Sequence, residues 1–215
     1  YQMSLIKNRA LDFDDLLVKA VEVLKNQDIQ KILNERLQWI LIDEYQDTNK
    51  VQFELTRLLA GEEKNLTVVG DASQAIYSFR GADFRNLSLL ETEYPQMLKV
   101  QLPKNYRSTQ NILDSAYSVV KNNTGHPVIK LESKQSGGEK IKLSETADET
   151  DEARTVVAEA SKLIGGSEEE VAVLYRTNFQ SRALEEAFFF FFVSYQVLGT
   201  KFYERKVVQD VFSYL

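Results

Sequence analysis

Cysteine is absent from the 215-residue chain, and histidine occurs once, at His126. These absences exclude a disulfide scaffold, a thiol nucleophile and a zinc site built from Cys and His. Any metal bound by this chain would therefore need oxygen ligands. A chain without cysteine also suits a reducing compartment, so we expect a cytoplasmic protein.

Glycine and proline are scarce, with 9 and 3 residues, while 43% of the chain is hydrophobic and 27% is charged. This composition is typical of globular domains rather than of disordered or fibrous chains. The longest apolar run, residues 187–193, is far shorter than the roughly 20 residues that cross a bilayer, so we expect no membrane span. The net charge of -6 means that nucleic acid would need a local basic cleft.

Short apolar runs alternate with amphipathic segments along the chain. Three runs have the length and composition of buried strands: residues 39–42, 66–69 and 171–174. Three segments have a helical period: residues 51–59, 112–120 and 153–163. Asp47 or Thr48 is placed to cap the first helix, and Gly165 and Gly166 follow the third. This alternation predicts an α/β fold with parallel sheets flanked by helices.

Two adjacent carboxylates, Asp43 and Glu44, follow the first predicted strand. In parallel sheets, ligands bind at the carboxyl ends of the strands. One acid there can hold Mg²⁺ together with water and phosphate oxygens, and its neighbour can orient and deprotonate an attacking water. The pair could instead cap the following helix, and taken alone it leaves both interpretations open.

Further motifs follow in order. The second predicted strand is followed by Gly-Asp-Ala-Ser-Gln-Ala-Ile-Tyr-Ser-Phe-Arg-Gly-Ala at residues 70–82, and Gln-Leu-Pro-Lys-Asn-Tyr-Arg-Ser occupies residues 101–108. The remaining motifs are at residues 11–16, 173–178, 180–182 and 201–206. With the acidic pair, they resemble the UvrD/Rep-type DNA helicases of superfamily 1, and the resemblance extends over nearly the whole chain.

The resemblance implies a RecA-like P-loop NTPase architecture with parts of two RecA-like domains. Residues 1–98 would be the C-terminal part of the first domain, and residues 99–215 the N-terminal part of the second. It also implies an ATP-dependent helicase or translocase that uses ATP and Mg²⁺ and moves 3′ to 5′. Its partners would be single-stranded DNA and duplex junctions.

The resemblance also implies roles for single residues around the nucleotide. Asp43 would hold Mg²⁺, and Glu44, beside the metal, would be the catalytic base. Gln46 and Gln74 would sense the γ-phosphate or its water. Three residues of the second domain would reach the same nucleotide: Arg107 as arginine finger, Tyr106 near the base and Arg176 toward phosphate.

Tyr77, Phe79 and Arg80 would form the surface for single-stranded DNA, where aromatic faces stack on bases and cations meet phosphates. Each has a structural alternative. Tyr77 and Phe79 alternate by two, so one could face the core of a strand. Arg80 could pair with an acid such as Glu44 or Asp71. Farther along the chain, Arg182 and Glu185 are three residues apart and could pair on a helix.

Some features depart from the family pattern. No Gly-x-x-x-x-Gly-Lys-Ser/Thr phosphate loop occurs in the 215 residues, so we expect the chain by itself to be inactive. Residues 188–192 are an unbroken phenylalanine run, where relatives have a mixed, partly polar helix end before a strand corresponding to residues 195–198. The alternative function is a helicase-like module that binds DNA or docks a protein without hydrolysing ATP.

Overall fold

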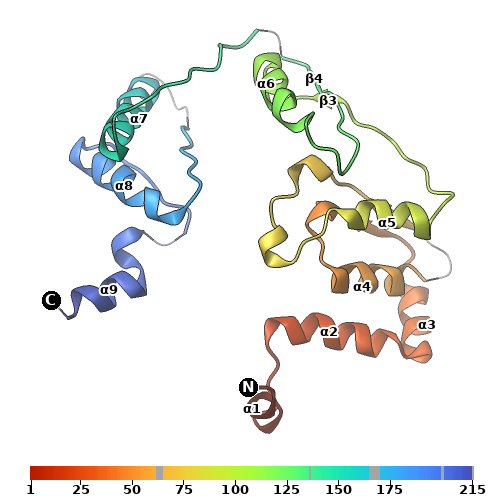
Figure 1. Cartoon of the computed structure of the whole chain (residues 1–215). Helices are drawn as coiled ribbons and strands as arrows, with labels where there is room; N and C mark the ends of the chain where they lie inside the picture. The colour runs from red at the N-terminus through yellow and green to blue at the C-terminus, as the bar shows by residue number, and fades with distance from the viewer. Residues whose placement is uncertain (62–64, 136, 165–169, 200, 215) are drawn as a thin grey trace. The chain divides into compact units, whose positions relative to one another are not determined.

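The computed structural model describes residues 1–61, 65–135, 137–164, 170–199 and 201–214. The chain divides into two compact units, Tyr1–Ile141 and Lys142–Leu215 (Figure 1). Among the described residues, no helix has the length and apolar character needed to cross a membrane.

A βαβ unit lies at the centre of the first compact unit. Strand β1 (Ile40–Ile42) pairs in parallel with strand β2 (Leu66–Val68), and helix α4 (Lys50–Ala60) connects them. The predicted strands at residues 39–42 and 66–69 and the helix between them are confirmed. The parallel pairing also confirms the α/β class, because parallel neighbours need such a crossover connection.

The other helices of the first unit are α1 (Gln2–Lys7), α2 (Phe13–Leu24), α3 (Gln27–Arg36), α5 (Arg85–Glu93) and α6 (Gln110–Val120). Helix α4 packs against α2 and α3 (Figure 1). Three short 3-10 turns follow the strands: η1 (Tyr45–Asp47), η2 (Ala72–Gln74) and η3 (Ser78–Arg80). Four of the ten predicted site residues lie within these turns: Gln46, Gln74, Phe79 and Arg80.

Helix α4 is capped by Asn49 and not by the predicted Asp47 or Thr48. The Asn49 side chain accepts from the Gln52 backbone N–H at 2.9 Å, and the Gln52 side chain accepts from the Asn49 N–H at 2.9 Å. The prediction was wrong because the preceding turn uses both earlier residues. Asp47 completes η1, and the Thr48 hydroxyl donates to the Tyr45 carbonyl at 2.7 Å.

The strands are less buried than their composition predicts. Leu41 in β1 is 76% exposed, and Val69 after β2 is 50% exposed, whereas Tyr45 and Leu90, elsewhere in the same unit, are buried. Side chains of a strand point alternately to its two faces. Among the described residues, only one face of this two-stranded sheet is covered, so its apolar runs are half open.

A second small sheet also lies in the first unit. Strand β3 (Lys104–Asn105) pairs in parallel with β4 (Glu132–Ser133), and the connection between them includes α6. The predicted helix at residues 112–120 is confirmed as α6, whose Leu113 is buried. This sheet positions the residues that follow β3.

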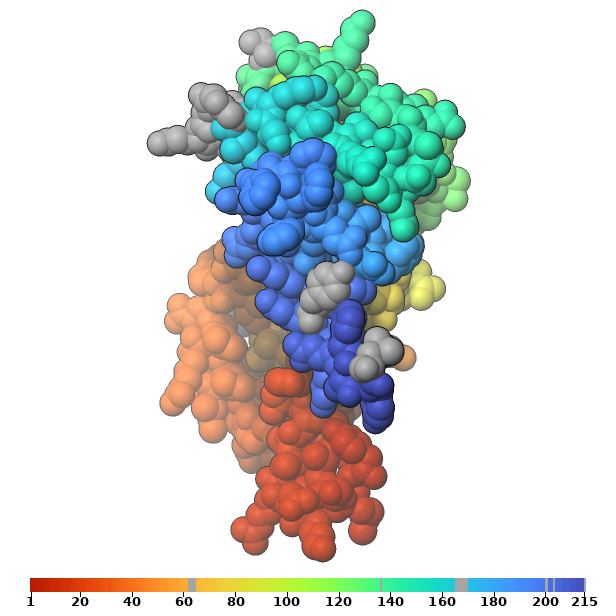
Figure 2. Space-filling view, turned by 90° about the vertical axis from the view of Figure 1, so that its left-hand side faces the viewer, coloured from red at the N-terminus to blue at the C-terminus, as the bar shows by residue number. Residues whose placement is uncertain are grey.

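The second unit is built on α7 (Glu149–Ile164) and α8 (Ser181–Phe190), whose side chains pack together (Figure 2). Its core contains Val157, Ala160 and Phe188. The shorter elements are η4 (Asn178–Gln180), η5 (Phe202–Glu204) and α9 (Lys206–Phe212). The predicted helix at residues 153–163 is confirmed as α7, and Gly165 and Gly166 lie outside the described residues.

The strands expected at residues 171–174 and 195–198 do not form. Val173 and Tyr195 pack against the core of the second unit, but Leu174 and Leu198 are each 93% exposed. An apolar run becomes a strand only beside a hydrogen-bonded neighbour. In the described part of the second unit, neither segment has one.

The phenylalanine run ends α8 in a Schellman motif. Val193 N–H donates to Phe188 O at 3.0 Å, and Phe192 N–H donates to Phe189 O at 3.1 Å. This geometry places Phe192 in the left-handed region, with φ of 55° and its side chain 95% exposed. Glycine usually occupies that position, because a Cβ there costs roughly 1–2 kcal/mol.

Replacing Phe192 with glycine should therefore stabilise the protein. The relieved strain exceeds the backbone entropy that glycine loses on folding, about 0.5–1 kcal/mol, so we expect the free energy of unfolding to rise by up to about 1 kcal/mol in urea titrations. Phe191→Gly is the matched control, because it removes the same ring at φ of -89° and should not stabilise. Equal effects of the two variants would contradict the strain argument.

Candidate functional site

The carboxyl ends of β1 and β2 are held side by side. Beyond the strands, Val69 N–H donates to Ile42 O at 2.8 Å, and Tyr45 N–H donates to Val69 O at 3.0 Å. Tyr45 is fully buried, and burial raises the pKa of its phenol. The segments that follow the two strands therefore begin from one rigid edge, where the sequence predicts the acidic pair.

Asp43 and Glu44 are both exposed at this edge. Asp43 Oδ1 accepts from the Glu44 backbone N–H at 2.9 Å, and Glu44 adopts the left-handed conformation with φ of 50° and ψ of 42°. Such strain costs roughly 1–3 kcal/mol and concentrates at functional sites. Neither carboxylate caps α4, which is capped by Asn49, so the helix-cap interpretation is wrong.

A buried glutamine orients the Glu44 side chain. Gln46 is 1% exposed, and its Nε2 donates to Glu44 Oε2 at 2.7 Å. Its Oε1 accepts from the Asp71 backbone N–H at 3.0 Å. A Cβ on Gly70 would lie 2.8 Å from that oxygen and 3.3 Å from Tyr45 N, so a larger residue does not fit beside the glutamine.

The hydrogen bonds continue from Gln46 through Asp71 to Gln74, and this series, which begins at Glu44, is here called the polar chain. Asp71 Oδ2 accepts from Gln74 Nε2 at 2.9 Å, while its Oδ1 accepts from Ser73 N–H at 2.9 Å. The structure thus brings together three of the residues predicted from sequence, Glu44, Gln46 and Gln74. Sequence reasoning assigned no site role to Asp71 and Gly70, although a Gly-Asp pair directly after an apolar run was the available signal.

The acidic pair fits a magnesium ion that arrives with its own ligands. Among the described residues, no three His, Asp or Glu side chains gather in a group that could hold a metal. Asp43 is exposed and uses only Oδ1 in the hydrogen bonds of the described residues. Mg²⁺ is usually bound by one or two carboxylates, with water and substrate phosphates completing its octahedron. The donor set suits that mode and not an all-protein cage.

Tyr77, Phe79 and Arg80 form an exposed group, here called the aromatic–cation cluster. The two rings are 6.1 Å apart between centroids and inclined at 45°. Arg80 Cζ lies 5.4 Å from the Tyr77 centroid and 5.5 Å from the Phe79 centroid. Phe79 is 76% exposed and Tyr77 is 38% exposed.

This geometry contradicts both structural alternatives for the cluster. The residues lie in and beside turn η3, so the alternation expected of a strand does not apply. Arg80 forms no ion pair with Glu44 or Asp71 in the described part of the chain and lies over its own neighbouring rings. Exposed ring faces beside a guanidinium can stack bases and contact phosphates.

The segment after β3 fixes the backbone of Tyr106 and Arg107. Asn105 Oδ1 accepts from Arg107 N–H at 2.9 Å and from Ser108 N–H at 2.8 Å. Gln135 Nε2 donates to the Tyr106 and Arg107 carbonyls at 3.0 and 3.1 Å. Both side chains are exposed, and that of Arg107 has no ion pair with any residue that the structure describes. A held backbone with a free guanidinium suits a residue that acts on a ligand.

Arg176 belongs to the second unit, whereas the other predicted site residues belong to the first. Its backbone N–H donates to Gln180 Oε1 at 3.1 Å, and its side chain lines an open groove of about 950 Å³. Other residues of the groove are Arg154, Arg182, Phe190 and Phe202.

The expected pair between Arg182 and Glu185 is wrong. Arg182 Nε donates to Glu186 Oε1 at 2.8 Å, four residues along α8. Glu185 is buried, and its carboxylate accepts from the Phe202 backbone N–H at 3.1 and 3.2 Å. Helix geometry places both acids within reach of the arginine, and tertiary packing assigns one of them to η5.

Comparison with known proteins identifies relatives along the whole chain. Residues 1–95 match the family model of the UvrD/REP helicase N-terminal domain, and residues 100–215 match that of the UvrD-like helicase C-terminal domain. The ATP-dependent DNA helicase PcrA of Staphylococcus epidermidis is 45% identical over 219 aligned residues, and that of Staphylococcus aureus is 43% identical. Each alignment covers all of this chain and 30% of the relative. The chain belongs to the UvrD/Rep helicase family.

Proposed function

We propose that the chain is the central part of a cytoplasmic ATP-dependent DNA helicase that couples ATP hydrolysis to 3′ to 5′ movement on single-stranded DNA and to duplex unwinding. The observation that carries this proposal is the polar chain from Glu44 through Gln46 and Asp71 to Gln74 at the strand ends. Relatives of this chain bear the name ATP-dependent DNA helicase, which supports the same activity.

In this proposal, residues 1–98 are the later part of one RecA-like domain, and residues 99–215 are the early part of a second. The two family matches, which meet between residues 95 and 100, support that division. The boundary between the two compact units lies elsewhere in the sequence, between Ile141 and Lys142. The phosphate loop that cradles the nucleotide is not among the 215 residues, so the chain by itself does not hydrolyse ATP.

Asp43 and Glu44 divide the work at the nucleotide. The exposed Asp43 carboxylate is the ligand for Mg²⁺, which when bound neutralises charge on the β- and γ-phosphates. Glu44 is the general base. Gln46 occupies Glu44 Oε2, which leaves Oε1 to accept the proton of the attacking water.

The proposed reaction is hydrolysis of the terminal phosphoanhydride bond. The water oxygen forms a bond to the γ-phosphorus while its proton passes to Glu44. The bond from that phosphorus to the bridging oxygen breaks, and ADP leaves with the electron pair. In this proposal Gln74 senses the γ-phosphate, and its hydrogen bond to Asp71, which connects it to Gln46 and Glu44, supports that role.

Arg107 is the arginine finger in this proposal. Its backbone is fixed through Asn105 and Gln135, while its guanidinium is free to stabilise charge on the transferring phosphoryl group. Tyr106 lies near the nucleotide base, and Arg176 is a second arginine directed at phosphate. The aromatic–cation cluster binds single-stranded DNA. The partners of the full-length protein also include the junctions between single-stranded and duplex DNA.

Glu44→Gln in the full-length protein should abolish turnover and preserve ATP binding, because the amide keeps the shape of the side chain but cannot accept the proton. We expect steady-state hydrolysis to fall by at least about 10²-fold. Asp43→Asn should weaken the Mg²⁺-dependent part of ATP affinity as well. Glu35→Gln, the same change on an exposed face of α3, is the control. Near-normal turnover of Glu44→Gln would rule out its role as base.

Arg107→Ala should lower the hydrolysis rate by on the order of 10³, with a smaller loss of ATP affinity, since the finger acts mainly on the transition state. Arg107→Lys should not restore the rate, because an ammonium cannot reproduce the planar guanidinium fork. Both variants should melt at the temperature of the wild type, as the side chain has no ion pair in the described residues. A large fall in melting temperature would instead indicate a structural role.

Phe79→Ala should weaken single-strand DNA binding by about 1–3 kcal/mol without changing the slope of log affinity against log salt, because stacking releases no counterions. Arg80→Ala should make that slope shallower by somewhat less than one unit if the guanidinium contacts phosphate. Phe189→Ala is the matched control, because this ring on α8 is 78% exposed and lies outside the motifs. Equal DNA affinity of Phe79→Ala and wild type would remove the ring from the DNA path.

A further inference from the structure

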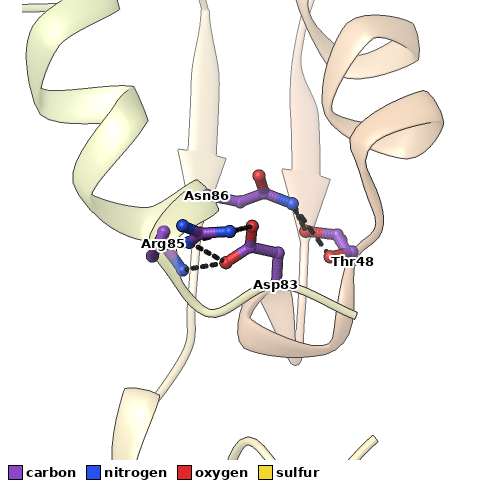
Figure 3. A network of polar contacts seen from close by, with 4 residues as sticks. All are labelled: Thr48, Asp83, Arg85 and Asn86. Carbon is purple, nitrogen blue, oxygen red and sulfur yellow. Dashed lines mark hydrogen bonds and ion pairs between the residues drawn. The ribbon is translucent and has the colours of Figure 1, made fainter. Parts of the chain in front are cut away.

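A second polar network lies beside the polar chain of Gln46 and involves residues with no role so far. Thr48, at the end of turn η1, lies opposite the start of α5, which packs against that turn (Figure 3). Thr48 O accepts from Asp83 N–H at 3.0 Å and from Asn86 Nδ2 at 2.8 Å. Asn86 Nδ2 also lies 3.2 Å from Thr48 Oγ1. Thr48 thus holds the start of α5 through one carbonyl and one hydroxyl.

The two partners in this contact connect to different parts of the proposed site: Thr48 to turn η1, and Asp83 to the aromatic–cation cluster. On the first side, Thr48 N–H and Oγ1 both donate to Tyr45 O, at 3.2 and 2.7 Å. Tyr45 lies between Glu44 and Gln46 in sequence, and its N–H donates to the carbonyl of Val69, the residue after β2. The position of Thr48 is therefore fixed to the turn that carries the candidate base.

On the second side, Asp83 ends the loop that carries the aromatic–cation cluster. That loop is closed by Ala82 N–H and Arg80 N–H, which donate to Tyr77 O at 3.3 and 2.9 Å. Asn86 N–H in turn donates to Asp83 O at 2.9 Å. The hydrogen bonds to Tyr77 O close this loop, and Asp83 and Asn86, which follow it, bind the Thr48 carbonyl directly.

The side chain of Asp83 takes no part in this connection. Its carboxylate faces Arg85, which donates from Nε at 2.8 Å and from Nη2 at 2.7 Å (Figure 3). These bonds lower the pKa of Asp83, so the carboxylate stays ionised at neutral pH. Arg85 is largely exposed and binds within its own turn. The buried partner of Thr48 is Asn86, which is 3% exposed.

We propose that Asn86 is a positioning residue that couples the aromatic–cation cluster to turn η1 and to Glu44, which precedes that turn. Its amide and the Asp83 N–H share one carbonyl, so the cluster loop and the turn of Glu44 move as one body. DNA on the cluster then favours the arrangement in which Glu44 is aligned, and loss of the amide loosens that linkage. This inference rests on the proposed function.

The test compares hydrolysis with and without single-stranded DNA in the full-length protein. Asn86→Ala should reduce the stimulation of kcat by saturating oligo(dT) about tenfold, within the usual range of coupling between sites. Its DNA-independent kcat and its affinity for oligo(dT) should stay within about twofold of wild type, because Asn86 touches neither ligand. A merely structural residue would lower all three quantities together.

Two further variants sharpen the comparison. Arg85→Ala is the matched control: it alters the same turn without contacting Thr48 and should keep full stimulation. Thr48→Val removes the longer contact with Asn86 and the bond from the hydroxyl to Tyr45 O, but it keeps both bonds to the Thr48 carbonyl, so it should reduce stimulation less than Asn86→Ala. If Asn86→Ala fails to fold, Thr48→Val carries the test: the two bonds to the carbonyl should keep the fold, and the loss of both hydroxyl contacts should still lower the stimulation of kcat.

Hydrogen exchange provides a readout that does not depend on activity. In the 215-residue chain, Asn86→Ala should speed exchange of the amides of residues 80–83 while leaving those of α4 unchanged. Unaltered exchange there, or full DNA stimulation in a folded Asn86→Ala protein, would overturn the coupling and leave the helicase proposal intact. A wild-type protein with no DNA-stimulated hydrolysis would overturn the proposed function and the coupling with it.

Discussion

The buried amide of Gln46 is the constraint on which the rest of the site depends. Its Nε2 donates to the Glu44 carboxylate, its Oε1 accepts from the Asp71 backbone N–H, and the residue is almost fully buried. Leaving either atom unpaired there would cost about 1–3 kcal/mol, so the amide can adopt only one orientation. Because the partners follow different strands, this orientation also fixes the spacing of the strand ends. The close approach of Gly70 belongs to the same constraint, since a Cβ at this position would displace the amide oxygen.

Two polar connections leave the same short turn in different directions. Gln46 connects it to the segment after β2, and Thr48 connects it to the start of α5. Both use backbone groups as partners, which hold their positions more firmly than exposed side chains do. The ion pairs of the described first unit are mostly exposed pairs of the kind that contributes little to stability. Order at the site therefore comes from buried amides and not from surface charge.

Local sequence patterns predicted the elements that depend on local physics. The apolar runs of β1 and β2 and the periods of α4, α6 and α7 were readable, because a parallel pair joined by a helix needs only those segments. The run at residues 171–174 has the same composition but no neighbouring strand among the described residues, and no local pattern reveals a missing neighbour. The acidic pair and Gln46 were named from motifs, whereas Asp71 and Asn86 bind partners 25 and 38 residues away, Asp71 through its backbone N–H and Asn86 through its side-chain amide. Such contacts become visible only when the chain is folded.

Two of the non-glycine residues with left-handed backbone, Glu44 and Phe192, differ in the contacts that their side chains make. Glu44 and Phe192 have nearly the same φ, 50° and 55°, and both carry the steric cost of a Cβ there. At Glu44 the side chain has a partner in Gln46 and an exposed oxygen at the strand ends, so a glycine would relieve the strain but remove the carboxylate. At Phe192 the ring is almost fully exposed, and the Schellman hydrogen bonds need only the backbone. At Glu44 the strain accompanies the proposed general base, whereas the strain at Phe192 has no such counterpart.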